Sequence, residues 1–213
     1  MSDIIASMPF LLQGAVITLQ VTVLAAIFGT IIGTIFGMGR LSKVPLLRIP
    51  SSIYIEFVRG TPLLVQIYII YFGLPSLGID LPPFTAAVVA LSINAGAYTA
   101  EIVRAGIQSI SRGQTEAARS LGMTVWQTMR YIILPQAFRN ILPALGNEFI
   151  ALTKESSLVS VIGIAELTRQ GQYIISRTFK SFEIYGGVAI VYFVITFTMA
   201  QIVNWIEKKV TIK

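Results

Sequence analysis

Long uncharged stretches alternate with short charged segments along most of this chain. Residues 4–39 carry no charged side chain, and neither do residues 60–79 or 81–100. A further apolar stretch covers residues 184–206, and Lys208 and Lys209 follow one residue later. Because a helix needs about 20 mostly apolar residues to cross a bilayer, the pattern predicts membrane-spanning helices rather than a soluble core.

The stretches predict an all-α integral membrane protein with five spans in a single domain, residues 1–213. The spans are expected at about residues 12–38, 58–76, 83–106, 138–160 and 183–207. The first stretch is longer than one span needs, so its beginning is expected to lie along the outer surface. The fourth span has the weakest pattern, since it contains Glu148, Lys154 and Glu155.

Basic residues predict the orientation, because lysine and arginine favour the cytoplasmic side of a membrane protein. With the N-terminus outside, the outer segments contain only Lys154, Arg169, Arg177 and Lys180. The inner segments contain Arg40, Lys43, Arg48, Arg104, Arg112, Arg119, Arg130, Arg139, Lys208, Lys209 and Lys213. Five spans therefore place the basic C-terminal end on the cytoplasmic side.

Composition narrows the possible functions. Only 12% of the residues are charged, against about 25% in soluble domains. The chain contains neither cysteine nor histidine, which excludes disulfides, Cys/His zinc sites and histidine-based nucleophile pairs. The net charge of +6 fits cytoplasmic membrane loops better than nucleic-acid binding. We expect no catalytic residue, no metal site and no nucleic-acid partner.

Residues 111–135 are too polar to span and are predicted to form two short cytoplasmic helices, at about 112–134. Ser111 with Gln114, and Thr124 with Gln127, each have the spacing of a capping box. Gly122 is expected to end the first helix in a positive-φ conformation. Leu134 and Pro135 are expected to end the second helix.

This segment resembles the EAA loop of the permease subunits of bacterial ATP-binding-cassette importers. The matching residues are Glu116, Ala117, Ala118, Gly122, Ile132, Leu134 and Pro135. Residues 59–66, 94–104 and 157–167 are similar to the polar amino acid branch of these permeases. The family has five spans with the N-terminus outside, as the charge pattern independently predicts.

The resemblance implies a set of partners. The helix pair is expected to dock on ABC ATPase subunits through the seven EAA-loop residues. A second permease subunit (in a homo- or heterodimer), an external solute-binding protein and an amino acid substrate complete the expected complex in the lipid of the bacterial plasma (inner) membrane. The chain has no G-x-x-x-x-G-K-[ST] loop, so ATP and Mg are expected on the partner ATPase. The chain is therefore expected to be a transporter subunit and no enzyme.

Polar residues within the predicted spans indicate the substrate path, since charges at membrane depth are costly and by default functional. Asn94, Tyr98 and Glu101 share one helix face, as do Glu148, Leu152 and Glu155. Together with Lys154 and Ser156 these residues are hypothesised to line the path. Asn94 and the acids of the fourth span would hold the ammonium group or cationic side chain of a polar amino acid, and Lys154 or backbone amides its carboxylate.

Several of these residues also have structural interpretations. Glu101 has the spacing to pair with Arg104, and Glu56 to pair with Arg59. Lys154 and Glu155 would simply be solvated if they lie near the outer surface. Residues 162–176, which include Glu166 and Arg169, are expected to form a short outer helix that touches the binding protein.

Two further alternatives concern assembly and function. Gly29, Gly33 and Gly37 recur every four residues and predict close helix packing, within the subunit or across a dimer. An ion-coupled amino acid carrier would explain acids at membrane depth without an ATPase, but not the EAA pattern. A membrane scaffold without transport would not need those acids.

Overall fold

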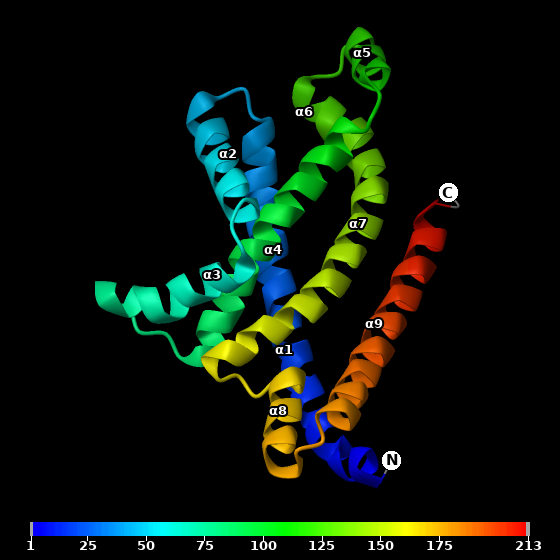
Figure 1. Cartoon of the computed structure of the whole chain (residues 1–213). Coiled ribbons are helices and arrows are strands. Elements are labelled where there is room, and N and C mark those ends of the chain that lie inside the picture. Colours follow the sequence, from blue (N-terminus) through cyan, green and yellow to red (C-terminus); the bar gives the residue numbers. More distant parts are fainter. Residues whose placement is uncertain (1, 212–213) are drawn as a thin grey trace.

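The computed structural model describes residues 2–211, and within that range it contains helices and no strand. Figure 1 shows two long helices, α1 (Ser2–Leu41) and α4 (Pro83–Gln108), which cross at the centre of the bundle. Helices α7 (Leu134–Glu155) and α9 (Ser181–Thr211) lie on one side of this pair. The all-α class predicted from the sequence is confirmed over the described residues.

Glycines let α1 and α4 approach closely. A Cβ atom on Gly33 would lie 2.4 Å from Cβ of Thr99, and one on Gly37 would lie 2.7 Å from the carbonyl oxygen of Ala100. Gly29 is similarly close to Ala95. The small-residue face predicted from the sequence therefore packs within the subunit, against α4. Helix α1 is also continuous from Ser2 to Leu41, so the residues before the predicted span belong to the same helix, and their place along the outer surface stays a prediction.

The second predicted span is not one straight helix. Helix α2 (Pro45–Arg59) precedes a break at residues 60–62, and α3 (Leu63–Tyr68) follows it at an angle of 106°. A π-helical turn (Ile69–Gly73) and a 3-10 turn (Leu74–Leu77) extend α3. The expectation of a span at 58–76 is wrong in this respect. Pro62 supplies no backbone N–H and disfavours the helical conformation of Thr61, which explains the break.

The number of spans is settled only in part. Among residues 2–211, the three helices α1, α4 and α9 are each long and apolar enough to cross a membrane, and the bent α2–α3 pair is a candidate fourth span. Helix α7 carries charged residues and does not meet that criterion. The N-terminal end of α1 lies at the opposite end of the bundle from α5 and the end of α9 (Figure 1). Five spans and the orientation stay predictions, and Lys213 lies outside the described residues.

The helix pair predicted at about residues 112–134 forms, with two changes. Helix α5 (Arg112–Ser120) ends before Gly122, whose φ of +83° confirms the expected turn. Thr124 begins α6 (Val125–Thr128) with a complete capping box. Ser111 caps α5 only through the amide of Gly113, so the first predicted box is incomplete.

The second helix does not end at Pro135. It continues through a π-helical turn (Met129–Ile133) into α7, where Pro135 occupies the first turn. A proline is tolerated there, because the wide turn leaves its position without a required N–H donor.

A short helix, α8 (Leu167–Thr178), follows the 3-10 turn Ser156–Ile162, close to the range predicted for it. The Glu166 carboxylate caps α8 by accepting from the amides of Thr168 at 2.8 Å and Arg169 at 2.7 Å. It also accepts from the Tyr192 hydroxyl on α9 at 2.9 Å. Burial raises the pKa of the Glu166 carboxyl, and these hydrogen bonds oppose the rise. Glu166 thus fastens α8 to α9.

Candidate translocation path and coupling surface

Asn94 lies at the centre of a buried hydrogen-bond network. Its side chain, 3% exposed, donates to Oε1 of Gln66 on α3 at 3.0 Å. The Gln66 amide nitrogen lies 2.8 Å from the Val58 carbonyl oxygen and 3.1 Å from that of Thr61. Gln66 therefore donates to carbonyls on both sides of the helix end at Arg59, and Asn94 holds Gln66 in position.

Tyr98 lies one turn further along α4 and contacts Arg59, the last residue of α2. The Arg59 guanidinium carbon is 5.4 Å from the centre of the Tyr98 ring, which is a cation–π contact. The pair that the sequence suggested between Glu56 and Arg59 does not form. Glu56 instead accepts a 2.9 Å hydrogen bond from Arg40 on α1, a partner 16 residues away in sequence.

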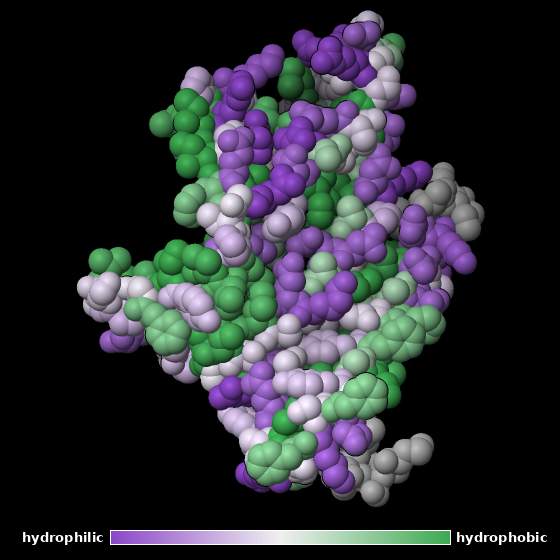
Figure 2. All heavy atoms as spheres, in the orientation of Figure 1, coloured by the Kyte–Doolittle hydropathy of each residue, from purple (hydrophilic) through white to green (hydrophobic). Residues whose placement is uncertain are grey.

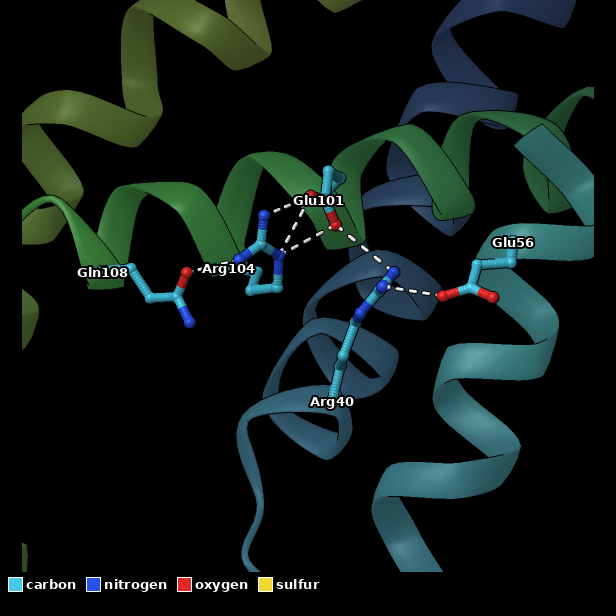
Figure 3. A network of polar contacts seen from close by, with 5 residues as sticks. All are labelled: Arg40, Glu56, Glu101, Arg104 and Gln108. Carbon is cyan, nitrogen blue, oxygen red and sulfur yellow. Dashed lines mark hydrogen bonds and ion pairs between the residues drawn. The ribbon is translucent and has the colours of Figure 1, made fainter. Parts of the chain in front are cut away.

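Figure 3 shows how Glu101 on α4 is linked through Arg40 on α1 to Glu56 on α2. Arg104 Nε donates to both carboxylate oxygens of Glu101, at 2.9 and 3.0 Å, which confirms the pairing predicted from the spacing. Arg104 also donates to the Gln108 side chain. Nη1 of Arg40 lies 3.6 Å from Oε2 of Glu101. Arg40 thus joins Glu56 of α2 to Glu101 of α4.

A cavity of about 530 Å³ lies between α1, α4, α7 and α9. Its wall is mostly apolar, and Thr99, Glu148 and Leu152 are among the residues that line it. Glu148 makes no hydrogen bond or ion pair with any residue that the structure describes. Of the acid face predicted on the fourth span, Glu148 and Leu152 therefore border one cavity, while Leu152 also belongs to the core.

The remaining predicted path residues lie where α7 ends. Glu155 is half-buried and is the last residue of the helix. Ser156 is fully buried and donates to the Thr153 carbonyl at 2.7 Å. Lys154 is exposed and borders a different, smaller pocket of about 280 Å³ beside Thr168 and Tyr192. The structure does not bring Lys154 together with Asn94 and Tyr98.

Hydrophilic residues gather over the middle of the face seen in Figure 2, while hydrophobic residues cover the projecting α3. Two of the polar residues at the α2–α3 bend, Arg59 and Gln66, were not among the path residues predicted from the sequence. Gln66 is a single polar side chain in an otherwise apolar stretch, and that isolation is the signal that was available.

The residues predicted to couple to an ATPase lie at the end of the bundle that carries α5. Glu116, Ala117 and Pro135 are exposed, and Ala118 is buried. Ile132 and Leu134 are partly buried and pack on the cluster around Ile133 and Ala137. Large apolar side chains are exposed on the same pair of helices, with Leu121 84% and Trp126 65% accessible. Exposed apolar residues of this size are typical of a docking surface.

Comparison with known proteins identifies the architecture. The sequence profile described as "Binding-protein-dependent transport system inner membrane component" matches residues 29–212. The chain belongs to this family. It is the family that the EAA-loop residues indicated, and the member proteins described next bear out the amino acid branch.

Among curated relatives, the glutamine transport system permease protein GlnP of Escherichia coli (strain K12) is 45% identical over 99% of this chain and 97% of its own. The arginine transport system permease protein ArtQ of Bacillus subtilis (strain 168) is 42% identical over 98% and 95%. A solved structure titled "Crystal structure of an amino acid ABC transporter with histidines" has 49% identity and a TM-score of 0.93, covering 96% of both chains. The chain thus matches permeases of this family over its whole length.

Proposed function

We propose that the chain is the membrane permease subunit of an ATP-driven importer of polar amino acids, cationic ones included. The observation that carries the proposal is the exposed α5–α6 pair, which bears Glu116, Ala117 and Ala118 of the EAA loop, in a chain 45% identical over 99% of its length to a glutamine permease. A relative named for arginine supports a polar substrate. An ion-coupled carrier is not favoured, because it leaves the exposed α5–α6 surface without a role.

In this proposal the α5–α6 pair docks on separate ATPase subunits, which bind ATP and Mg. ATP-driven closure of the ATPase dimer moves two docked pairs together and opens the bundle outward, and hydrolysis returns it inward. Each ligand shifts the equilibrium only through its different affinity for the two states. A second permease subunit and an external binding protein in the bacterial inner membrane complete the complex.

The substrate path of the proposal combines the polar residues of α4 with the acids of α7. Asn94, Tyr98 and Glu101 supply one side, and Glu148 and Glu155 the other. Glu148 borders the cavity and has no hydrogen-bonding partner among the described residues, so a ligand ammonium group can approach it. Asn94 holds the α2–α3 bend through Gln66, which makes its contribution to the path a positioning one.

The proposal is tested by purifying the chain with the ATPase encoded beside it and measuring ATP hydrolysis in liposomes. The cognate binding protein and a panel of amino acids are supplied in turn. Stimulation by polar amino acids supports the proposal, while a stable complex without a response removes the amino acid assignment. If no ATPase co-purifies, the ion-coupled carrier becomes the better interpretation. Unchanged transport by Glu155→Ala and by Asn94→Ala would remove those residues from the path.

A further inference from the structure

Helix α3 and the two turns after it, Leu63–Leu77, form an arm that projects from the side of the bundle (Figure 1). One face of this α3 arm packs on the core of its own chain through the buried Ile67 and Ile70. The opposite face is uncovered, and Figure 2 shows that it is hydrophobic as well. Its exposed large side chains are Val65, Tyr68, Ile69, Phe72 and Leu77. A helix that is apolar all round is one that a partner or the membrane buries.

The backbone of the α3 arm is a poor match for lipid. The arm contains a π-helical turn and a 3-10 turn, and the exposed segment of residues 78–82 follows it. Within residues 2–211, the backbone amides of Asp80 and Leu81 donate no hydrogen bond. Irregular backbone is tolerated at membrane depth only where protein buries it or water reaches it. The tip of the arm therefore borders protein or water rather than acyl chains.

The surface at the base of the arm is charged. Glu56 and Arg59 are exposed on the last turn of α2, directly before the arm begins. Figure 1 shows that α2 ends about halfway along the bundle, and Figure 2 shows hydrophilic residues over the middle of the same face. Charged groups at this depth are costly against lipid. The face that the arm borders is therefore turned toward another protein and the water between them.

A second copy of the chain meets both requirements. Two-fold pairs of identical chains are the commonest closed assemblies, and in such a pair the same patch occurs on both partners. Aromatic rings are enriched in the cores of interfaces. Phe72 is 60% exposed and joins two ring pairs, with centroids 5.8 Å from Tyr68 and 4.8 Å from Tyr71. Its neighbours hold this ring in place, so it is the natural anchor of a contact.

We propose that the exposed face of the α3 arm, anchored by Phe72, packs against a second copy of this chain. This inference rests on the proposed function, which requires a second permease subunit, and deepens it by naming the contact surface and by making the two subunits identical. The polar faces of the two copies then enclose one space that lipid does not enter.

The experiment uses the permease–ATPase complex in liposomes, with two copies of the chain that carry different affinity tags. The photo-reactive residue p-benzoylphenylalanine replaces Phe72 in one preparation and Phe193 of α9 in the other. Phe193 is the matched control, because it is 64% exposed and lies in a candidate span. Illumination is expected to give an adduct that carries both tags from position 72, and adducts with lipid alone from position 193.

Three results would overturn the proposal. One is an assembled complex in which position 72 labels lipid only. Another is a double-tagged adduct of equal yield from both positions, which reflects crowding in the bilayer. The third arises in cells that also express the neighbouring genes: if position 72 labels a different permease chain there, the second copy is excluded.

The same liposomes separate this inference from the proposed function, since ATP hydrolysis is measured in them with the binding protein and polar amino acids. If hydrolysis is stimulated but no double-tagged adduct forms, the arm contact fails and the importer stands. If the adduct forms but no amino acid stimulates hydrolysis, the amino acid assignment fails and the arm contact stands.

A second measurement follows the association of fluorescently labelled copies by energy transfer in liposomes. Phe72→Ala is expected to weaken association by about 10-fold or more, because an aromatic anchor is truncated, and Phe193→Ala is expected to leave it unchanged. If Phe72→Ala does not fold, Ile69→Ala decides, since Ile69 is 53% exposed on the same arm and loses a smaller side chain. Association equal to that of Phe193→Ala contradicts the proposal.

Discussion

The side-chain nitrogen of Asn94 lies 3.0 Å from the side-chain oxygen of Gln66, and this hydrogen bond joins α4 to the bend between α2 and α3. The Gln66 amide in turn contacts two carbonyl oxygens on the α2 side of the bend. Both side chains are buried, so neither has water as an alternative partner. The pair therefore explains how a helix broken in mid-bundle keeps its backbone groups satisfied.

Replacing Gln66 by leucine is expected to destabilise the bend. The change leaves the amide of Asn94 and the carbonyl of Thr61 without partners, and leaves the Val58 carbonyl with only the longer hydrogen bonds from Thr61, at about 1–3 kcal/mol for each buried group left unsatisfied. Thermal unfolding of the detergent-solubilised complex measures the loss. Gln201→Leu, at an exposed position of α9, should have little effect. Equal stability of the two variants would show that the network does not support the bend.

Adding a single methyl group to the contact between α1 and α4 (the α1–α4 seam) should destabilise the fold. In Gly33→Ala the new Cβ meets Thr99 and the Gly96 carbonyl within 2.7 Å. Overpacking of this kind typically costs about 1–3 kcal/mol. Gly186→Ala on α9 is the control, since no atom lies within 4 Å of its Cβ position. Unfolding temperatures should separate the two variants, and the seam is looser than described if Gly33→Ala matches Gly186→Ala.

The turn between α5 and α6 should control coupling rather than insertion. Gly122 has a φ of +83°, which proline is unable to adopt, so Gly122→Pro must reorient the pair. The variant is expected to insert normally and to hydrolyse ATP without a response to substrate. Normal transport by Gly122→Pro would contradict the role assigned to the turn.

A gentler comparison tests the same turn. Gly122→Ala meets no atom within 4 Å, so any defect reflects backbone strain of about 1–2 kcal/mol. Gly113→Ala, at a glycine without positive φ, supplies the control. Substrate-stimulated ATPase activity is the measurement, and only the Gly122 variant is expected to lower it.

The two tryptophans allow a matched test of the docking surface. Trp126 is 65% exposed on α6, and Trp205 is 58% exposed on α9. Buried aromatic anchors at interfaces commonly contribute about 2 kcal/mol or more, so Trp126→Ala should weaken ATPase binding by roughly 30-fold. Trp205 lies on α9, outside the proposed docking surface, so Trp205→Ala should leave ATPase binding unchanged. Binding is measured by titrating the purified ATPase, and equal affinities would exclude Trp126 from the interface.

The network in Figure 3 should contribute unequally to stability. Arg40→Gln removes ion pairs whose Glu56 partner is 69% exposed, and exposed pairs contribute about 0–1 kcal/mol. Glu101→Leu should cost more, because it leaves Arg104 and Arg40 without the carboxylate they share. Unfolding at low and high salt tests this, since screening should weaken only the exposed pair. The reverse order of the two losses would refute it.

Some features could be predicted because their causes lie within a few residues of each other. Apolar runs predicted α1, α4 and α9, and Gly122 with the spacing of Thr124 and Gln127 predicted where α5 ends and α6 begins. Glu101 and Arg104 pair as their helical spacing predicted. The EAA-loop residues predicted the family, which the matching profile confirms. The assignment of path and coupling residues stays a prediction.

Other features depended on which helices cross. A long uncharged stretch predicts a span but does not show where a single proline breaks the helix. The 106° bend was therefore missed. Glu56 pairs with Arg40 and not with its helical neighbour Arg59. Packing of α2 on α1 brings Arg40, which is farther away in sequence, closer in space.

The sequence by itself determined the helical class, the short helix pair at residues 112–128 and the family, since composition and i, i+4 spacing are properties of the chain alone. Only the tertiary structure decided that Gln66 completes the bend, that Glu101 is shared by two arginines, and that Arg59 contacts the Tyr98 ring. The physical reason is that a polar side chain bonds to whatever packing brings within about 3 Å of it. That distance is set by the crossing of helices far apart in sequence.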